Sequence, residues 1–138
     1  MRTADGCIAA RVGEALCLLG NAAAALSYTS EEAMAPSLMH GAHLAAARVR
    51  GVAFAALGDS AKAAACLEQS HAGAAEQAFV MPQVRALQAM VECGIEGVDA
   101  AARLGAVLRQ LDGSPEQIAE LLQSRDGETT IDVHALLQ

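Results

Sequence analysis

Residues 47–63 read ARVRGVAFAALGDSAKA, and residues 9–25 read AARVGEALCLLGNAAAA. The two segments align with Gly13 on Gly51, an offset of 38 residues. Alanine supplies 33 of the 138 residues, so the shared alanines carry little weight. The informative match is a pair of glycines seven residues apart, the second followed by Asn21 or Asp59. A fixed period of this size is typical of an array of helix pairs, in which each pair buries its apolar face against its neighbours.

The composition predicts an all-α protein. Alanine has the highest helix propensity, whereas the residues that favour strands (Val, Ile and Thr) are sparse. The only aromatic residues are Tyr28, Phe54 and Phe79, so small side chains must fill much of the core. A chain of 138 residues suits one domain. We therefore expect a single all-α domain over 1–138.

Glycine, proline and capping residues divide the chain into eight expected helices. Gly20 and Gly58 end helices, and Asn21 and Asp59 cap the helices that follow. Thr29 is expected to act as an N-cap, with Glu32 at the capping-box spacing. Four expected helices cover residues 7–19, 21–34, 37–57 and 59–78. The fifth has Pro82 in its first turn and ends near residues 93–94, and the last three cover 98–111, 115–124 and 130–137. Their short connections predict antiparallel neighbours.

The residues that repeat resemble those of the tetratricopeptide repeat (TPR). The clearest copy spans 44–77, and its matching positions are Gly51, Phe54, Leu57, Gly58, Asp59, Ala63 and Leu67. The copy before it keeps Gly13, Leu16, Leu19, Gly20, Asn21 and Ala25 but has Thr29 in the place of Leu67. A third, degenerate copy keeps Leu87, Met90, Cys93 and Gly94. Because the offset exceeds the roughly 34 residues usual for this repeat, a few residues are expected to be inserted within 31–40.

The resemblance implies a TPR-like α-solenoid of about three antiparallel helix–turn–helix pairs. These pairs would occupy residues 7–111, and acidic capping helices would occupy 112–138. The acidic character is plain, because residues 112–138 hold six acids and one base, whereas the whole chain has a net charge of −7. Gly51 and Ala63 would allow close approach of paired helices, and Phe54 and Leu67 would fill the space between them.

The resemblance also implies a concave groove, lined by the first helix of each pair, that binds a peptide or a partner helix. The groove residues we single out are Glu14, Arg48, Val52, Gln88 and Glu92. The further positions implied to face it are Cys7, Ala10, Cys17, Leu18, Ala45, Ala55, Ala56, Met81, Val84 and Val91. The family's best-known clamp for a C-terminal carboxylate needs Lys, Asn and Arg at such positions, and only Arg48 fits. The sequence therefore does not predict that clamp.

Charge and cysteine usage limit the partners and the compartment. A net charge of −7 argues against a phosphate-binding surface and hence against nucleic acid as a partner. The four cysteines form no paired motif, which indicates free thiols and the cytoplasm or another reducing compartment. The longest uncharged stretch, 15–30, is too short and too polar to span a bilayer, so no membrane association is expected.

No motif for catalysis, nucleotide binding or a cofactor occurs in the sequence. His40 and His43 lie three residues apart on one expected helix, a spacing that can share a metal ion. No acid or cysteine lies near them in the sequence to complete a site, which favours structural or surface histidines. We therefore expect a non-enzymatic protein–protein interaction module. The alternatives are a structural subunit or homo-oligomer of a larger assembly, and a metal-binding protein that uses His40 and His43.

Overall fold

The predicted all-α class is confirmed. The computed structural model describes residues 2–95, 99–123 and 131–138, with side chains from Ile8 onward. These residues form nine helices and no strand. The helices are α1 (Arg2–Leu18), α2 (Ala22–Tyr28), α3 (Glu31–Met34), α4 (His40–Ala56), α5 (Ser60–Glu76), α6 (Val80–Glu92), α7 (Ala100–Leu108), α8 (Pro115–Leu122) and α9 (Val133–Leu137). No helix in this described part of the chain is both long and apolar enough to cross a membrane.

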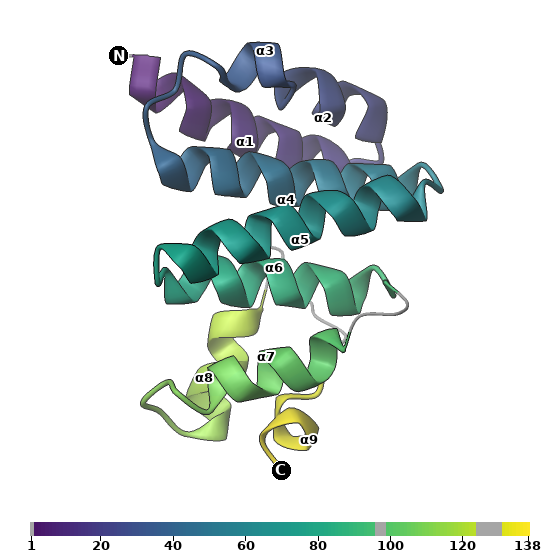
Figure 1. Cartoon of the computed structure of the whole chain (residues 1–138). Helices are drawn as coiled ribbons and strands as arrows, with labels where there is room; N and C mark the ends of the chain where they lie inside the picture. Colours follow the sequence, from purple (N-terminus) through teal and green to yellow (C-terminus); the bar gives the residue numbers. More distant parts are fainter. Residues whose placement is uncertain (1, 96–98, 124–130) are drawn as a thin grey trace.

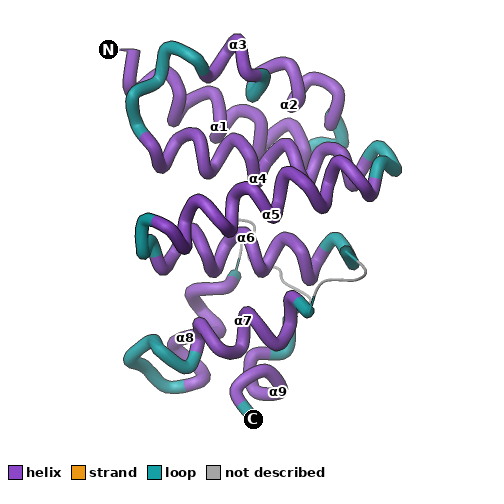
Figure 2. Tube along the Cα trace, in the orientation of Figure 1, coloured by secondary structure: helices purple, strands orange, loops and turns teal. Residues whose placement is uncertain are grey.

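The helices stack side by side from one end of the molecule to the other (Figure 1). α1 packs against α2 and α4, α4 packs most extensively against α5, and α5 packs against α6. α7 then packs against α6, and α9 packs against α7 and α8. The connections from α1 to α6 alternate between the two sides of this stack (Figure 2). As a result α1, α4 and α6, which are far apart in sequence, all run from the left of Figure 1 to the right.

Two turns repeat each other in atomic detail at the 38-residue offset. Gly20 and Gly58 adopt φ values of 82° and 84°, in the left-handed region that favours glycine. The backbone N–H groups of Asn21 and Asp59 donate to carbonyls five residues earlier, at 2.8 and 2.9 Å. Their side chains cap α2 and α5 by accepting from the backbone N–H three residues later, at 3.2 and 3.1 Å. The sequence match is therefore also a match of local structure.

The close approaches of paired helices repeat at the same offset. A Cβ atom added at Gly51 would lie 2.6 Å from Cγ of Leu67. A Cβ atom added at Gly13 would lie 2.9 Å from Cγ2 of Thr29. Leu67 and Thr29 are themselves 38 residues apart, and both are buried. α4 and α5 thus approach closely where Gly51 faces the buried Leu67. α1 likewise approaches closely, at Gly13, to Thr29, the residue that ends α2.

The core changes character along the stack. Between α2 and α4 it consists of Val49 and small residues, namely Ala22, Ala25 and Ala53. From α5 to α9 it is built from larger side chains, mainly Leu67, Val84, Leu87, Met90, Leu104, Leu108, Ile118, Leu122 and Val133. Leu67 belongs to this larger core although it also faces Gly51 in α4. It therefore connects the α4–α5 pair to the C-terminal helices.

The single helix expected over 21–34 is wrong, because the chain breaks at Thr29 and Ser30. The hydroxyl of Thr29 donates to the carbonyl oxygen of Ala25 at 2.8 Å. Ser30 is extended, and its Oγ accepts the backbone N–H of Ala33 at 3.1 Å. Ser30, not Thr29, is therefore the N-cap of α3. α3 and the loop that follows it occupy the region where the inserted residues were expected.

The other helix boundaries differ by a few residues. α4 begins at His40 instead of residue 37. α6 begins at Val80, so Pro82 lies in its first turn as expected. Ser114 caps α8, because its Oγ accepts the backbone N–H of Gln117 at 3.2 Å. The expected helix starts at residues 98 and 130 lie outside the described residues; within them, α7 begins at residue 100 and α9 at residue 133.

Two glycines of α4 give a matched test of the close approach. Gly51→Ala is expected to lower the free energy of unfolding by about 1–3 kcal/mol, because its Cβ would overlap Leu67. Gly41→Ala should leave it unchanged or raise it by up to about 1 kcal/mol, because no atom lies within 4 Å of the added Cβ. Urea denaturation measures both, and equal stability of the two variants would contradict the packing described.

Candidate functional site

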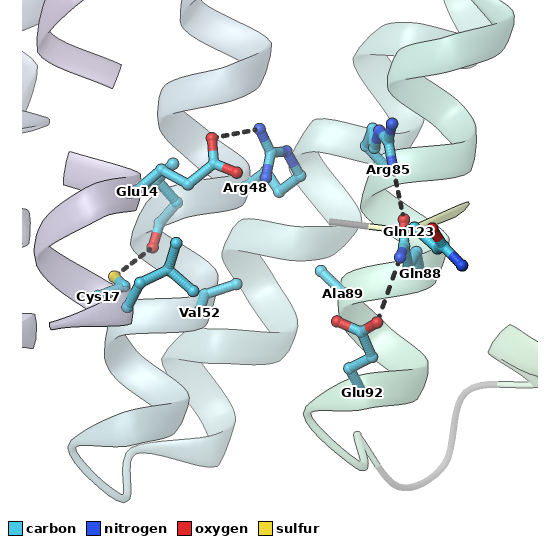
Figure 3. A pocket seen from close by; sticks show the side chains of 11 residues that line it. Glu14, Cys17, Arg48, Val52, Arg85, Gln88, Ala89, Glu92 and Gln123 are labelled. Atoms are coloured by element: carbon cyan, nitrogen blue, oxygen red, sulfur yellow. Dashed lines mark hydrogen bonds and ion pairs between the residues drawn. The ribbon is translucent and has the colours of Figure 1, made fainter. Parts of the chain in front are cut away.

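A cavity of about 260 Å³ opens between α1, α4 and α6, and we call it the central cavity. Its wall also includes Gln123, the residue that follows α8. Figure 3 shows side chains from these separate elements arranged around it. The lining residues are Glu14, Cys17, Leu18, Arg48, Val49, Val52, Arg85, Gln88, Ala89, Glu92 and Gln123.

The structure brings together all five groove residues singled out from the sequence. Glu14 comes from α1, Arg48 and Val52 come from α4, and Gln88 and Glu92 come from α6. Their convergence follows from the stack, because α4 packs against both α1 and α6. Residues spread over almost 80 positions of sequence thus lie on the wall of one cavity.

An ion pair crosses the central cavity from α1 to α4. Nη2 of Arg48 lies 3.5 Å from Oε2 of Glu14. The side chain of Arg48 is 20% exposed and that of Glu14 is 44% exposed. A pair with this much access to water contributes only about 0–1 kcal/mol to stability. The pair therefore contributes little to the stability of the α1–α4 packing.

A chain of hydrogen bonds forms the α6 wall of the cavity. Nη1 of Arg85 donates to Oε1 of Gln88 at 3.0 Å, and Nε2 of Gln88 donates to Oε1 of Glu92 at 3.2 Å. The same Nε2 also donates to the carbonyl oxygen of Leu122 at the end of α8. Because Gln88 is only 5% exposed, these bonds satisfy a buried amide and fix its orientation. Gln88 thereby links the cavity wall to the C-terminal helices.

The thiols are poorly suited to nucleophilic chemistry. Cys17 lines the central cavity and donates weakly to the carbonyl oxygen of Val49 at 4.0 Å. Burial raises the pKa of the Cys17 thiol, and the nearby Glu14 carboxylate raises it further. Burial also raises the pKa of Cys66 and of Cys93. Since the thiolate is the nucleophile, these three groups are held in their less reactive form.

A second, more apolar cavity of about 180 Å³ lies beside the first, and we call it the small cavity. Arg48 and Arg85 line both cavities. The hydroxyl of Ser70 donates to the carbonyl oxygen of Leu44 at 2.8 Å. The full lining is Gly41, Leu44, Ala45, Arg48, Ser70, Met81, Pro82 and Arg85. The two cavities together follow α4 and α6, and we call them the groove.

The wider set of expected groove positions is only partly correct. Of the further positions, Cys17, Leu18, Ala45 and Met81 also line the groove. Ala10 and Val84 are buried instead, with 4% and 0% of their surface exposed. Ala55, Ala56 and Val91 line neither cavity, and the side chain of Cys7 lies outside the described residues.

Sequence reasoning missed two polar groups of the central cavity, Arg85 and Gln123. Arg85 precedes Gln88 by three residues on the same helical face, so the helical period could have identified it. Gln123 lies at the end of α8, and its position depends on how the C-terminal helices dock. No local sequence signal could have found it.

The histidine pair has structural partners. Nε2 of His43 lies 2.9 Å from the carbonyl oxygen of Ser37, in a hydrogen bond that holds the loop before α4. The ring of His40 lies 6.3 Å from the ring of Phe79, measured between centroids. Within the described ranges, no group of three or more His, Cys, Asp and Glu side chains could hold a metal ion.

A second charged cluster joins α5 to α7, away from the groove. Nη1 of Arg103 lies 2.7 Å from Oε1 of Glu68, and Nη2 of Arg103 lies 2.7 Å from Nδ1 of His71. The guanidinium lowers the pKa of the Glu68 carboxyl through this hydrogen bond. Burial lowers the pKa of His71 below its ordinary value of 6.5, and the positive charge of Arg103 lowers it further. Neutral His71 accepts the hydrogen bond that links the two helices.

This cluster predicts a pH dependence of stability. Folded His71 binds a proton less readily than unfolded His71, so its contribution is present above pH 6.5 and is lost as the pH falls below that value. His71→Gln keeps a hydrogen-bond acceptor but does not titrate. Denaturation between pH 7.5 and pH 5.5 should therefore show a shallower loss of stability in the variant than in the wild type. Parallel curves would contradict the assignment.

Comparisons with known proteins leave the groove as the main guide to function. No family model, curated protein or solved structure matches this chain. A function must therefore be inferred from the chemistry of the described residues.

Proposed function

We propose that this chain is a non-enzymatic protein–protein interaction module that binds a partner protein in the groove along α1, α4 and α6. In this proposal the fold is a TPR-like α-solenoid of about three helix pairs, closed by acidic helices over 112–138. The matched turns at Gly20 and Gly58 and the matched close approaches at Gly13 and Gly51 support a repeated helix pair. Because no family model matches, the support for the repeat rests on the sequence and structure of this chain alone.

The observation that carries the proposal is the convergence of Glu14, Arg48, Val52, Gln88 and Glu92 on the central cavity. Helical arrays use such inner surfaces to bind extended or helical segments. Cavities of about 260 and 180 Å³ have room for individual side chains of a partner. The mixture of apolar, charged and amide groups along the wall suits recognition of a protein segment.

The state of the reactive groups supports recognition over catalysis. Glu14 is paired with Arg48, and Glu92 accepts a hydrogen bond from Gln88. The thiol of Cys17 has a raised pKa. Catalytic acids, bases and nucleophiles need groups poised to exchange protons near the working pH. Glu14, Glu92 and Cys17 are instead engaged in an ion pair, a hydrogen bond and a weak hydrogen bond, respectively.

The same proposal places the protein in the cytoplasm or another reducing compartment, with neither nucleic acid nor membrane as a partner. Cys17, Cys66 and Cys93 are free thiols, which supports a reducing environment. The net charge of −7 disfavours binding to phosphate backbones.

Site-specific crosslinking tests the groove. Leu18 lines the central cavity and is 61% exposed, so p-benzoylphenylalanine at this position should crosslink a bound partner. The matched control carries the same group at Gln69, an exposed position of α5 that lines neither cavity. In extracts of the native source, a discrete adduct is expected from position 18 and not from position 69. Mass spectrometry of the adduct identifies the partner.

Charge reversal gives the second arm of the experiment. Adding Arg48→Glu and Glu92→Arg to the position-18 protein should reduce the adduct severalfold, because both residues line the cavity. Identical adducts from both positions, or none from either, would overturn the groove-binding function. An adduct with a second copy of this chain would favour the alternative, a homo-oligomer or structural subunit.

A further inference from the structure

We propose that the small cavity and the two arginines at its edge form a subsite for an acidic–apolar segment of the partner. One apolar side chain of the segment enters the small cavity, and a neighbouring Asp or Glu side chain binds between Arg48 and Arg85. This inference rests on the proposed function and names the chemistry of the partner segment.

The small cavity has the size and lining for one apolar side chain. Its volume is about 180 Å³, and its wall includes the apolar residues Leu44, Ala45, Met81 and Pro82. An apolar cavity of about 150 Å³ is large enough to bind benzene. The one hydroxyl in the lining, that of Ser70, already donates to the carbonyl oxygen of Leu44. A Leu, Met or Phe side chain is therefore a better occupant than a polar group.

Both charged residues in the lining of this cavity are arginines. Its lining contains Arg48 and Arg85 and no acidic residue, although the whole chain has a net charge of −7. Arg48 is only 20% exposed, so water screens its guanidinium less than that of a surface arginine. Arginine binds carboxylates by strong charge-assisted hydrogen bonds. The complementary ligand group beside the apolar side chain is thus a carboxylate.

The two arginines lie where the small cavity meets the central cavity. Both line both cavities, and Figure 3 shows one on the α4 wall and one on the α6 wall. Leu44 precedes Arg48 by four residues, and Met81 precedes Arg85 by four. Four helical residues span about 6 Å, which matches two residues of an extended segment. The spacing therefore fits an apolar residue and an acidic residue two positions apart.

Glu14 acts as a competitor for the partner carboxylate. Its Oε2 lies 3.5 Å from Nη2 of Arg48, at the guanidinium that the incoming acid would bind. Because Glu14 is 44% exposed, its replacement by Gln should cost little stability. Glu14→Gln would leave Arg48 available to the ligand. The proposal therefore makes two opposite predictions for neighbouring residues, in that loss of an arginine weakens binding and loss of Glu14 strengthens it.

The test is an NMR titration of the full, isotope-labelled chain with the peptide GSLSESG. The expected result is a shift of the Met81 methyl signal and of the Arg48 and Arg85 side-chain Nε signals. The dissociation constant should rise about tenfold in Arg48→Gln and in Arg85→Gln, and should fall severalfold in Glu14→Gln. Arg11→Gln is the matched control, since it removes one positive charge at an exposed position outside the groove and should change nothing.

Two altered peptides test the subsite on the unmodified protein, so the result does not depend on the folding of any variant. GSLSKSG, with Lys in place of the acid, and GSSSESG, with Ser in place of the apolar residue, should each bind at least tenfold more weakly than GSLSESG. Equal binding of all three peptides, or no shift with any of them, would overturn the subsite. So would a response to decanoate without a response to GSLSESG, which would indicate an amphiphile site instead.

The outcomes separate this subsite from the proposed function. If position 18 crosslinks a partner but GSLSESG does not bind, the groove function stands and the acidic–apolar subsite is wrong. If position 18 gives no groove-specific adduct and the peptide also fails to bind, both proposals are wrong.

Discussion

The close approach of α4 and α5 at Gly51 is the constraint on which the rest of the structure depends. Leu67 fills the space that a side chain at residue 51 would need. It also belongs to the large core formed with α6 to α9. One leucine therefore packs against the backbone of α4 and against the C-terminal helices. Since Arg48 and Val52 flank Gly51 on α4, this contact also fixes the wall of the groove.

The abundance of alanine explains both the stack and the chemistry of the groove. Alanine loses no side-chain entropy in a helix, and its small size lets neighbouring helices approach closely. Between α2 and α4 the core consists largely of such residues. Long polar side chains are correspondingly few, so the arginines at positions 48 and 85 and the acids at 14 and 92 stand out on the inner face. The residues that pack the helices and the residues that line the groove overlap, because Val49 both packs between α2 and α4 and lines the central cavity.

The sequence predicted the turns more accurately than the packing between segments that are distant in sequence. Gly20 and Gly58 marked two turns correctly, because a glycine with positive φ followed by a capping residue is a local signal. The cap of α3 was misplaced by one residue because it depends on which hydroxyl of Thr29 and Ser30 caps α3 and which bonds back along α2. Both arrangements are locally compatible with the sequence, and tertiary packing selects between them.

The prediction of the groove residues also failed where their position depends on tertiary packing. Its five principal residues were identified through the implied equivalence of the first helix of each pair, and all five lie on the central cavity. Val84 was expected on the groove but is fully buried, because the α6 face that contains it packs into the large core. Gln123, which lies towards the C-terminal end of the sequence, also lines the central cavity. Its place there depends on the docking of α8, as does the bond from Gln88 to the Leu122 carbonyl.

A double-mutant cycle between Gly51→Ala and Leu67→Ala tests the central packing claim most directly. Free energies of unfolding would be measured by urea denaturation for the wild type, both single variants and the double variant. If the added Cβ is destabilising because it meets Leu67, removal of the Leu67 side chain should abolish that cost, with a coupling energy of about 1–3 kcal/mol. Additive effects of the two substitutions, to within about 0.5 kcal/mol, would contradict the account.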